Sequence, residues 1–152
     1  VSSEQGADYA SFFGLPMSLA YFINQDCLHL AKPYRENFQK SIFGDSPQVS
    51  VAVFAICAET NEEANLLASS ASIWRENVSK GIFGPFPTLE EATKKIKDKE
   101  EGKSIVGDQK YVEGQLMKIL EETNADELKI ITICESMSSK KESYRLIKEI
   151  FS

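Results

Sequence analysis

The feature that most constrains the fold is the apolar run from Val49 to Thr60, Val-Ser-Val-Ala-Val-Phe-Ala-Ile-Cys-Ala-Glu-Thr. Eight of the ten positions from Val49 to Ala58 are Val, Ile, Phe or Ala, with almost no polar alternation. Such a run is typical of a strand covered on both faces, as in a parallel sheet. Thr60-Asn61-Glu62-Glu63 then has the pattern of a capping box, which begins a helix.

Two further apolar runs, Met17–Ile23 and Leu128–Cys134, are also predicted to be strands, and helical patterns alternate with all three. Gly14 and Pro16 should end the first helix. A second helix is predicted over Gln25–Lys40, kinked or restarted at Pro33. Alternating strands and helices predict an α/β fold with a parallel sheet and right-handed crossovers. A chain of 152 residues is short for two domains, so residues 1–152 are predicted to form one.

The remaining patterns give more local predictions. A stripe at helical spacing is predicted to be core; it comprises Ala64, Leu67, Ala68, Ala71, Trp74 and Val78. Gly81–Pro87 is predicted to be a loop folded back onto the body, followed by a capping box at Thr88 and a solvated charged run over Lys97–Gly102. Ser104–Asp108 is predicted to be a turn with Asp108 capping the next helix. The last helix should be capped by Ser139 and bury Tyr144, Ile147 and Phe151.

Composition excludes some classes of function. The net charge of −6 and the pI of about 4.9 disfavour binding to nucleic acids or anionic membranes, both of which favour basic surfaces. The odd cysteine count, Cys27, Cys57 and Cys134, indicates reduced thiols in a cytoplasmic protein. No signal peptide or long apolar span is evident, so the chain is expected to be soluble. Its start at Val1, without a complete first element, suggests a piece of something longer.

The candidate site follows from the predicted topology, because working sites of parallel α/β sheets lie beyond the carboxyl ends of the strands. This rule selects four segments that should converge: Ser2 and Ser3, Phe22–Asn24, Cys57–Glu59 and Cys134–Ser136. Ser2 or Ser3 would cap the first helix, whose positive end could hold an anion such as phosphate. The alternative is a capped helix with no ligand.

Other chemistry finds little support. His29 is the only histidine, and a lone histidine on a helix is more often an ordinary side chain than a catalyst. No cysteine or histidine cluster has metal-ligand spacing, so no metal site is predicted. Trp74 could stack on a cofactor ring, but its helical spacing favours packing. Neither a nucleophile elbow, a Walker loop, a Gly-x-Gly-x-x-Gly nor a Ser/His/Asp set is present.

An ordered set of short motifs adds a resemblance. The set is Ser2-Ser3 with Gly6-Ala7, Gly14–Met17 with Ala20–Phe22, Val51–Val53 with Ala58–Ala64, Ile105–Gly107, and Ala125–Leu128. In this order it resembles the C-terminal half of bacterial luciferase-like, flavin-dependent monooxygenases. The resemblance implies a partial TIM (β/α)8 barrel, with the end of strand five, strands six to eight and their helices. Strands one to four would be absent.

The resemblance also implies a cofactor and its site. Ser2 and Ser3, with the backbone amide of Gly6, would bind the phosphate of reduced FMN. The most similar subgroup usually has Gly before the serine pair and Ser at the later position, where this chain has Val1 and Gly6. Flavin, not a protein nucleophile, would activate O2 to oxidise a small substrate such as an aldehyde, and the deazaflavin F420 is a weaker alternative.

A half barrel would leave sheet edges and an apolar inner face uncovered, so self-association as a homodimer is expected. The alternative is a smaller open sheet whose helices close over the gap. A functional alternative of a different class is a non-catalytic fragment or self-associating module that lacks the full flavin pocket.

Overall fold

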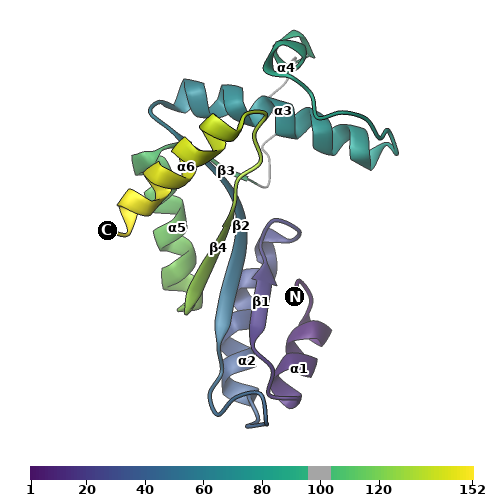
Figure 1. The fold of residues 1–152 in the computed structure, drawn as a ribbon. Coiled ribbons are helices and arrows are strands. Elements are labelled where there is room, and N and C mark those ends of the chain that lie inside the picture. Colours follow the sequence, from purple (N-terminus) through teal and green to yellow (C-terminus); the bar gives the residue numbers. More distant parts are fainter. Residues whose placement is uncertain (96–103) are drawn as a thin grey trace. The chain divides into compact units, whose positions relative to one another are not determined.

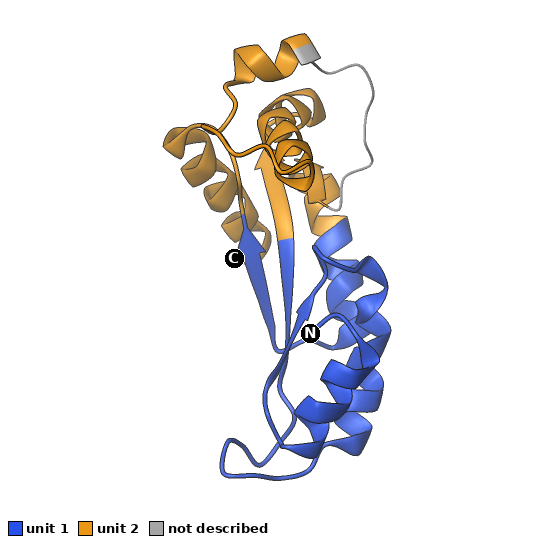
Figure 2. Cartoon of the chain, turned by 90° about the vertical axis from the view of Figure 1, so that its right-hand side faces the viewer, with its two compact units in different colours: residues 1–53, 115–131 blue, residues 54–114, 132–152 orange. Residues whose placement is uncertain are grey.

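The computed structural model describes residues 1–95 and 104–152 (Figure 1). These residues form two compact units (Figure 2), one of residues 1–53 with 115–131 and one of residues 54–114 with 132–152. The first half of strand β2 (Val49–Ala58) belongs to the first unit and its second half to the second. The charged run predicted over Lys97–Gly102 lies outside the described residues. The single domain over residues 1–152 stays a prediction.

The first unit contains most of the N-terminal elements. They are α1 (Glu4–Phe12), β1 (Met17–Ala20), the 3-10 helix η1 (Gln25–Leu30) and α2 (Ala31–Asn37). The end of α5 (Gln109–Thr123) and all of β4 (Glu127–Ile131) complete it. Strand β1 pairs in parallel with β2, with Met17 opposite Val49, and β4 also pairs with β2. The fully buried side chains of this unit include Leu19, Val51 and Tyr34.

The second unit contains the second half of β2 with α3 (Asn61–Ser79), α4 (Leu89–Lys95), β3 (Ser104–Asp108) and α6 (Met137–Ile150). Strand β3 pairs in parallel with β2, with Phe54 opposite Ser104. The core of this unit joins Ile56 and Ala58 of β2 to Ala64, Leu67 and Ala68 of α3. Parallel strands joined by helices confirm the predicted α/β class.

Helix ends confirm most of the predicted caps. Thr60 Oγ1 accepts a hydrogen bond from Glu63 N at 3.2 Å, and Asp108 Oδ1 accepts one from Tyr111 N at 2.8 Å. At Thr88 the capping box is reciprocal, because Glu91 N donates to Thr88 Oγ1 and Thr88 N donates to Glu91 Oε2. The predicted cap at Ser139 is wrong. Ser136 caps α6, since its Oγ accepts from Ser139 N at 3.0 Å.

Strand predictions fail where a strand depends on pairing with a segment that is distant in the sequence. Ser104–Asp108 is a strand and not a turn, because β2 pairs with it residue by residue. The strand predicted over Met17–Ile23 ends at Ala20, where a turn bonds Ile23 N to Ala20 O at 2.9 Å. The strand predicted over Leu128–Cys134 ends at Ile131. After it, Thr132 bonds to Ala55 O through its side-chain hydroxyl at 2.8 Å.

Several predicted core residues are exposed instead. Val78, Tyr144 and Phe151 are exposed, whereas Ile147 and most of the α3 stripe are buried as predicted. The loop before α4 is only partly folded back: Phe83 is 82% exposed, while Phe86 packs near Trp74 with ring centroids 6.2 Å apart. This packing agrees with a structural role for Trp74. In residues 1–95 and 104–152, no helix combines the length and the apolar character needed to cross a membrane.

Ser70 on α3 gives a stability prediction. Its side chain is fully buried, and its hydroxyl has no hydrogen-bond partner among the described residues. Because an unpaired buried hydroxyl loses its hydration without compensation, Ser70→Ala should raise the free energy of unfolding by about 1 kcal/mol. Urea denaturation would measure the change. Ser69→Ala is the matched control and should not stabilise, since the buried Ser69 hydroxyl donates to Leu66 O.

Candidate functional site

The Ser2-Ser3 turn leads into α1, in the first unit. Ser3 is the N-cap, with extended backbone angles (φ −140°, ψ 155°), and its Oγ accepts a hydrogen bond from Gly6 N at 3.4 Å. The first intrahelical bond runs from Ala7 N to Ser3 O. Helix geometry therefore leaves the amides of Glu4 and Gln5 without a helical acceptor. The prediction that Ser2 or Ser3 caps this helix is confirmed for Ser3.

Backbone pairing with β1 holds the residue before the turn. Val1 N donates to Ser18 O at 2.6 Å, and Ala20 N donates to Val1 O at 2.8 Å. This is the bonding pattern of a parallel neighbour on the edge of β1 that faces away from β2. Val1 therefore lies beside β1, and the prediction that it ends a longer strand stays a prediction.

A second strand end also reaches the turn. Asn24, which follows β1, donates from Nδ2 to Ser2 O at 3.2 Å. The sequence placed Phe22–Asn24 and the serine pair at one site, and the structure brings Asn24 to Ser2. Cys57–Glu59 and Cys134–Ser136 belong to the other unit. Their convergence with Ser2 and Ser3 stays a prediction.

The donor set of the turn suits a phosphate group. Ser3 Oγ accepts from Gly6 N, which leaves its own proton to donate, and hydroxyls and first-turn amides are common phosphate ligands. Gly6 keeps the turn open, because a Cβ there would lie 3.2 Å from Val1 Cγ1 and 3.5 Å from Ser3 Oγ. The amide of Gly6 is already engaged by Ser3, so a ligand would compete with that long bond. The exposed carboxylate of Glu4 is the one unfavourable neighbour in the first turn.

In the second unit, the strand ends selected from the sequence have structural partners. Cys134 packs against the core cluster that contains Ile56 and Ala58. Glu135 Oε2 accepts a hydrogen bond from Leu89 N at 2.8 Å and so anchors the start of α4.

Burial raises the pKa of Cys57 to about 11, and burial also raises the pKa of Cys27 and of Cys134. All three are therefore thiols at neutral pH and poor nucleophiles.

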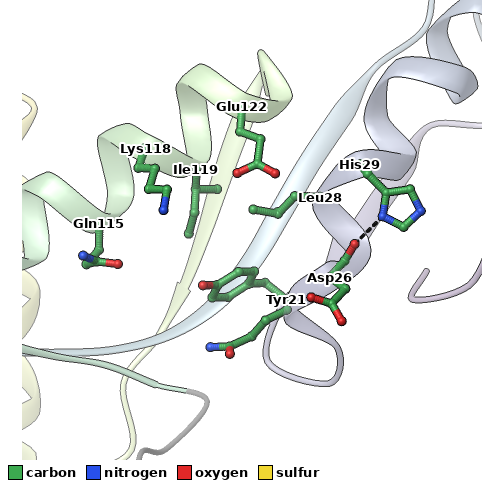
Figure 3. A pocket seen from close by; sticks show the side chains of 9 residues that line it. Tyr21, Asp26, Leu28, His29, Gln115, Lys118, Ile119 and Glu122 are labelled. Atoms are coloured by element: carbon green, nitrogen blue, oxygen red, sulfur yellow. Dashed lines mark hydrogen bonds between the residues drawn. The ribbon is translucent and has the colours of Figure 1, made fainter.

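The first unit also has a cavity of about 350 Å3 beside η1 and α5 (Figure 3). Leu28 and Ile119 form its buried floor, and exposed polar side chains, His29 and Lys118 among them, surround it. His29 Nδ1 bonds to the carbonyl of Asp26, in its own 3-10 helix. This contact is local and gives no support for a catalytic role. No three His, Cys, Asp or Glu residues of the described chain are grouped as a metal site would require.

Comparison with sequences finds relatives without a described activity, and no family model matches the chain. The uncharacterized proteins YceB and YwcH of Bacillus subtilis strain 168 are 30% and 29% identical to it, over 97% and 99% of its length. The chain spans about half the length of these relatives, 47% of YceB and 48% of YwcH.

Comparison with solved structures identifies the fold. The crystal structure of apo-MsnO8 matches with a TM-score of 0.90 and 26% identity, over 99% of this chain and 49% of that one. The monooxygenase RslO1 from Streptomyces bottropensis matches with a TM-score of 0.64 and 17% identity, over 96% and 43% of the two chains.

A third match carries a cofactor. It is the oxygenating constituent of 3,6-diketocamphane monooxygenase from Pseudomonas putida, a type II Baeyer-Villiger enzyme in complex with FMN. The TM-score is 0.57 and the identity 18%, over 93% of this chain and 43% of that one. The chain therefore has a fold shared with flavin-dependent monooxygenases.

Proposed function

We propose that the chain is part of a luciferase-like, flavin-dependent monooxygenase that uses reduced FMN and O2 on a small organic substrate such as an aldehyde. The observation that carries this proposal is the fold shared with RslO1 and with the FMN-bound camphane monooxygenase, over more than nine-tenths of the chain. Reduced FMN would supply the activation of oxygen. The raised pKa values of the three cysteine thiols and the local bond of His29 are consistent with a protein that provides no nucleophile of its own.

In this proposal the chain's residues bind and orient the cofactor. The hydroxyls of Ser2 and Ser3 and the amides of the first turn of α1 would hold the flavin phosphate, with Gly6 leaving the space open. The phosphate would thereby fix one end of the flavin against the sheet. In a flavin enzyme the cofactor carries the chemistry, and the protein binds and orients it.

We also propose that the chain supplies the end of strand five and strands six to eight of a (β/α)8 barrel. The parallel pair β1–β2 and the pairing of β4 with β2 support it, as does the pairing of Val1 on the outer edge of β1. So does the coverage of about half of each relative. In a closed barrel, that edge of β1 would be hydrogen-bonded to strand five.

Titration with FMN tests the proposed cofactor. Quenching of flavin fluorescence should saturate in the micromolar range, and a parallel titration with the deazaflavin F420 should bind more weakly. Absence of saturable binding at several hundred micromolar FMN would remove the proposal for this chain.

Exposed apolar side chains favour a second candidate, a self-associating module without catalysis. Tyr9, Phe12 and Phe13 of α1 and its end, and Ile42 and Phe43 of the loop before β2, are between 55% and 94% exposed. Apolar side chains gathered on a surface commonly mark association sites. A homodimer is therefore expected in sedimentation velocity at micromolar concentration. A monomer that binds no hydrophobic dye would contradict this expectation.

A further inference from the structure

We propose that Asn24 is a positioning residue for the flavin phosphate, because its side chain fixes the orientation of the Ser2-Ser3 turn. This inference rests on the proposed function and adds to it a residue outside the phosphate-binding motif. Asn24 touches the backbone of the turn and would not touch the cofactor.

Both ends of the Asn24 side-chain amide are engaged. Nδ2 donates to Ser2 O at 3.2 Å, across 22 residues of sequence, and this bond is partly buried. Oδ1 accepts from Asp26 N at 3.1 Å, where Asn24 is the N-cap of η1. Because one end accepts and the other donates, the side-chain amide of Asn24 serves both partners at once. The cap sets the orientation in which the amide nitrogen reaches Ser2.

The bond to Ser2 O controls a donor on its other side. In a trans peptide unit the carbonyl and the next amide point in opposite directions. When Asn24 holds the Ser2 carbonyl, the amide of Ser3 is turned to the side away from Asn24. Without this bond the peptide unit can rotate and present a carbonyl oxygen, which repels an anion, in place of the amide.

The other restraints on the turn do not replace Asn24. Pairing with β1 fixes Val1, and the cap between Ser3 and Gly6 fixes the first turn of α1. The peptide unit between Ser2 and Ser3 lies between these two restraints. Asn24 is the side chain that reaches it from the end of β1.

The test compares FMN with riboflavin, which has the same ring but no phosphate. Asn24→Ser keeps an oxygen that can cap η1, but its side chain is too short to reach Ser2 O. In the full-length protein, the dissociation constant for FMN should rise about tenfold, and that for riboflavin should change less than about twofold. Asn24→Thr keeps the cap as well and should show the same selective loss of FMN affinity. Agreement between the two variants would show that the loss does not come from misfolding of one of them.

Thr60→Ala is the matched control, because it removes the N-cap of α3 in the other unit and leaves the turn unchanged. The ratio of FMN to riboflavin affinity should stay at the wild-type value in this variant. If the wild-type protein does not prefer FMN over riboflavin, the proposed function and this inference both fail. If the wild type prefers FMN and the Asn24 variants keep that preference, the inference alone is overturned.

Discussion

Replacing Gly14 with alanine is expected to lower the free energy of unfolding by about 3 kcal/mol, measured by urea denaturation. Gly14 has a φ of +63° and ends α1, with Leu15 N donating to Ala10 O at 2.8 Å. The left-handed backbone alone costs a side chain about 1 kcal/mol. A Cβ would also lie 2.2 Å from the backbone oxygen of Gln39 and 2.7 Å from Ser41 Cβ. Such an overlap with backbone adds about 1–3 kcal/mol.

Two other glycines separate these contributions. Gly81 also has a positive φ, +73°, but a Cβ there would meet nothing within 4 Å, so Gly81→Ala should cost only about 1 kcal/mol. At Gly84 a Cβ would again meet nothing, and no positive φ is involved, so Gly84→Ala should be close to neutral. Equal losses for Gly14→Ala and Gly81→Ala would show that the contact with Gln39 carries no energy.

Gly14 also illustrates what a sequence can predict. The end of α1 follows from local chemistry, because a glycine after a helix and a proline soon after it require no distant partner. The same holds for the caps at Ser3, Thr60 and Thr88, and for the buried strand β2, whose apolar run contains its own signal. The contact of Gly14 with Gln39 is not local, and no pattern indicated it.

Features that depend on distant partners were predicted poorly. Ser104–Asp108 contains a glycine and two polar ends, and it becomes strand β3 only because the second half of β2 lies beside it. Phe83 and Phe151 are apolar but exposed, and the local sequence does not determine whether another part of the chain covers such side chains. Such positions are decided by tertiary packing, which overrides local preference.

The candidate site was predictable in part for the same reason. The rule for strand ends placed Asn24 near the serine pair, and the hydrogen bond to Ser2 O confirms that proximity. The role of its amide, however, depends on the direction of one peptide unit, which no local sequence pattern determines. The phosphate-binding role itself came from the resemblance and not from the pattern of residues.

Asp126 gives the second large effect, because it joins the start of β2 to α2. Its Oδ2 accepts from Val49 N at 2.7 Å and from Arg35 Nη2 at 3.1 Å, while Asp126 N donates to Val49 O at 2.8 Å. Asp126→Asn removes the ion pair, and because the Asp126 side chain is 53% exposed, the free energy of unfolding at pH 7 should fall by about 1 kcal/mol. Glu127→Gln is the matched control. Among the described residues Glu127 forms an ion pair with the exposed Lys129 alone, at 3.4 Å, so loss of the Glu127 charge should cost less than about 0.5 kcal/mol.

The effect of Asp126 should also depend on pH, with a sign that the structure determines. The hydrogen bond from Val49 N lowers the pKa of Asp126 below its ordinary value of 3.8, and Arg35 lowers it further against the opposing effect of burial. The unfolded chain therefore takes up this proton first as pH falls, so the stabilisation is complete above about pH 5 and is lost at lower pH. In urea denaturation at pH 7, 5 and 3, the deficit of Asp126→Asn relative to wild type should be constant between pH 7 and 5 and smaller at pH 3. A deficit that is as large at pH 3 as at pH 7 would mean that the carboxylate is not the stabilising group, and that packing around residue 126 is.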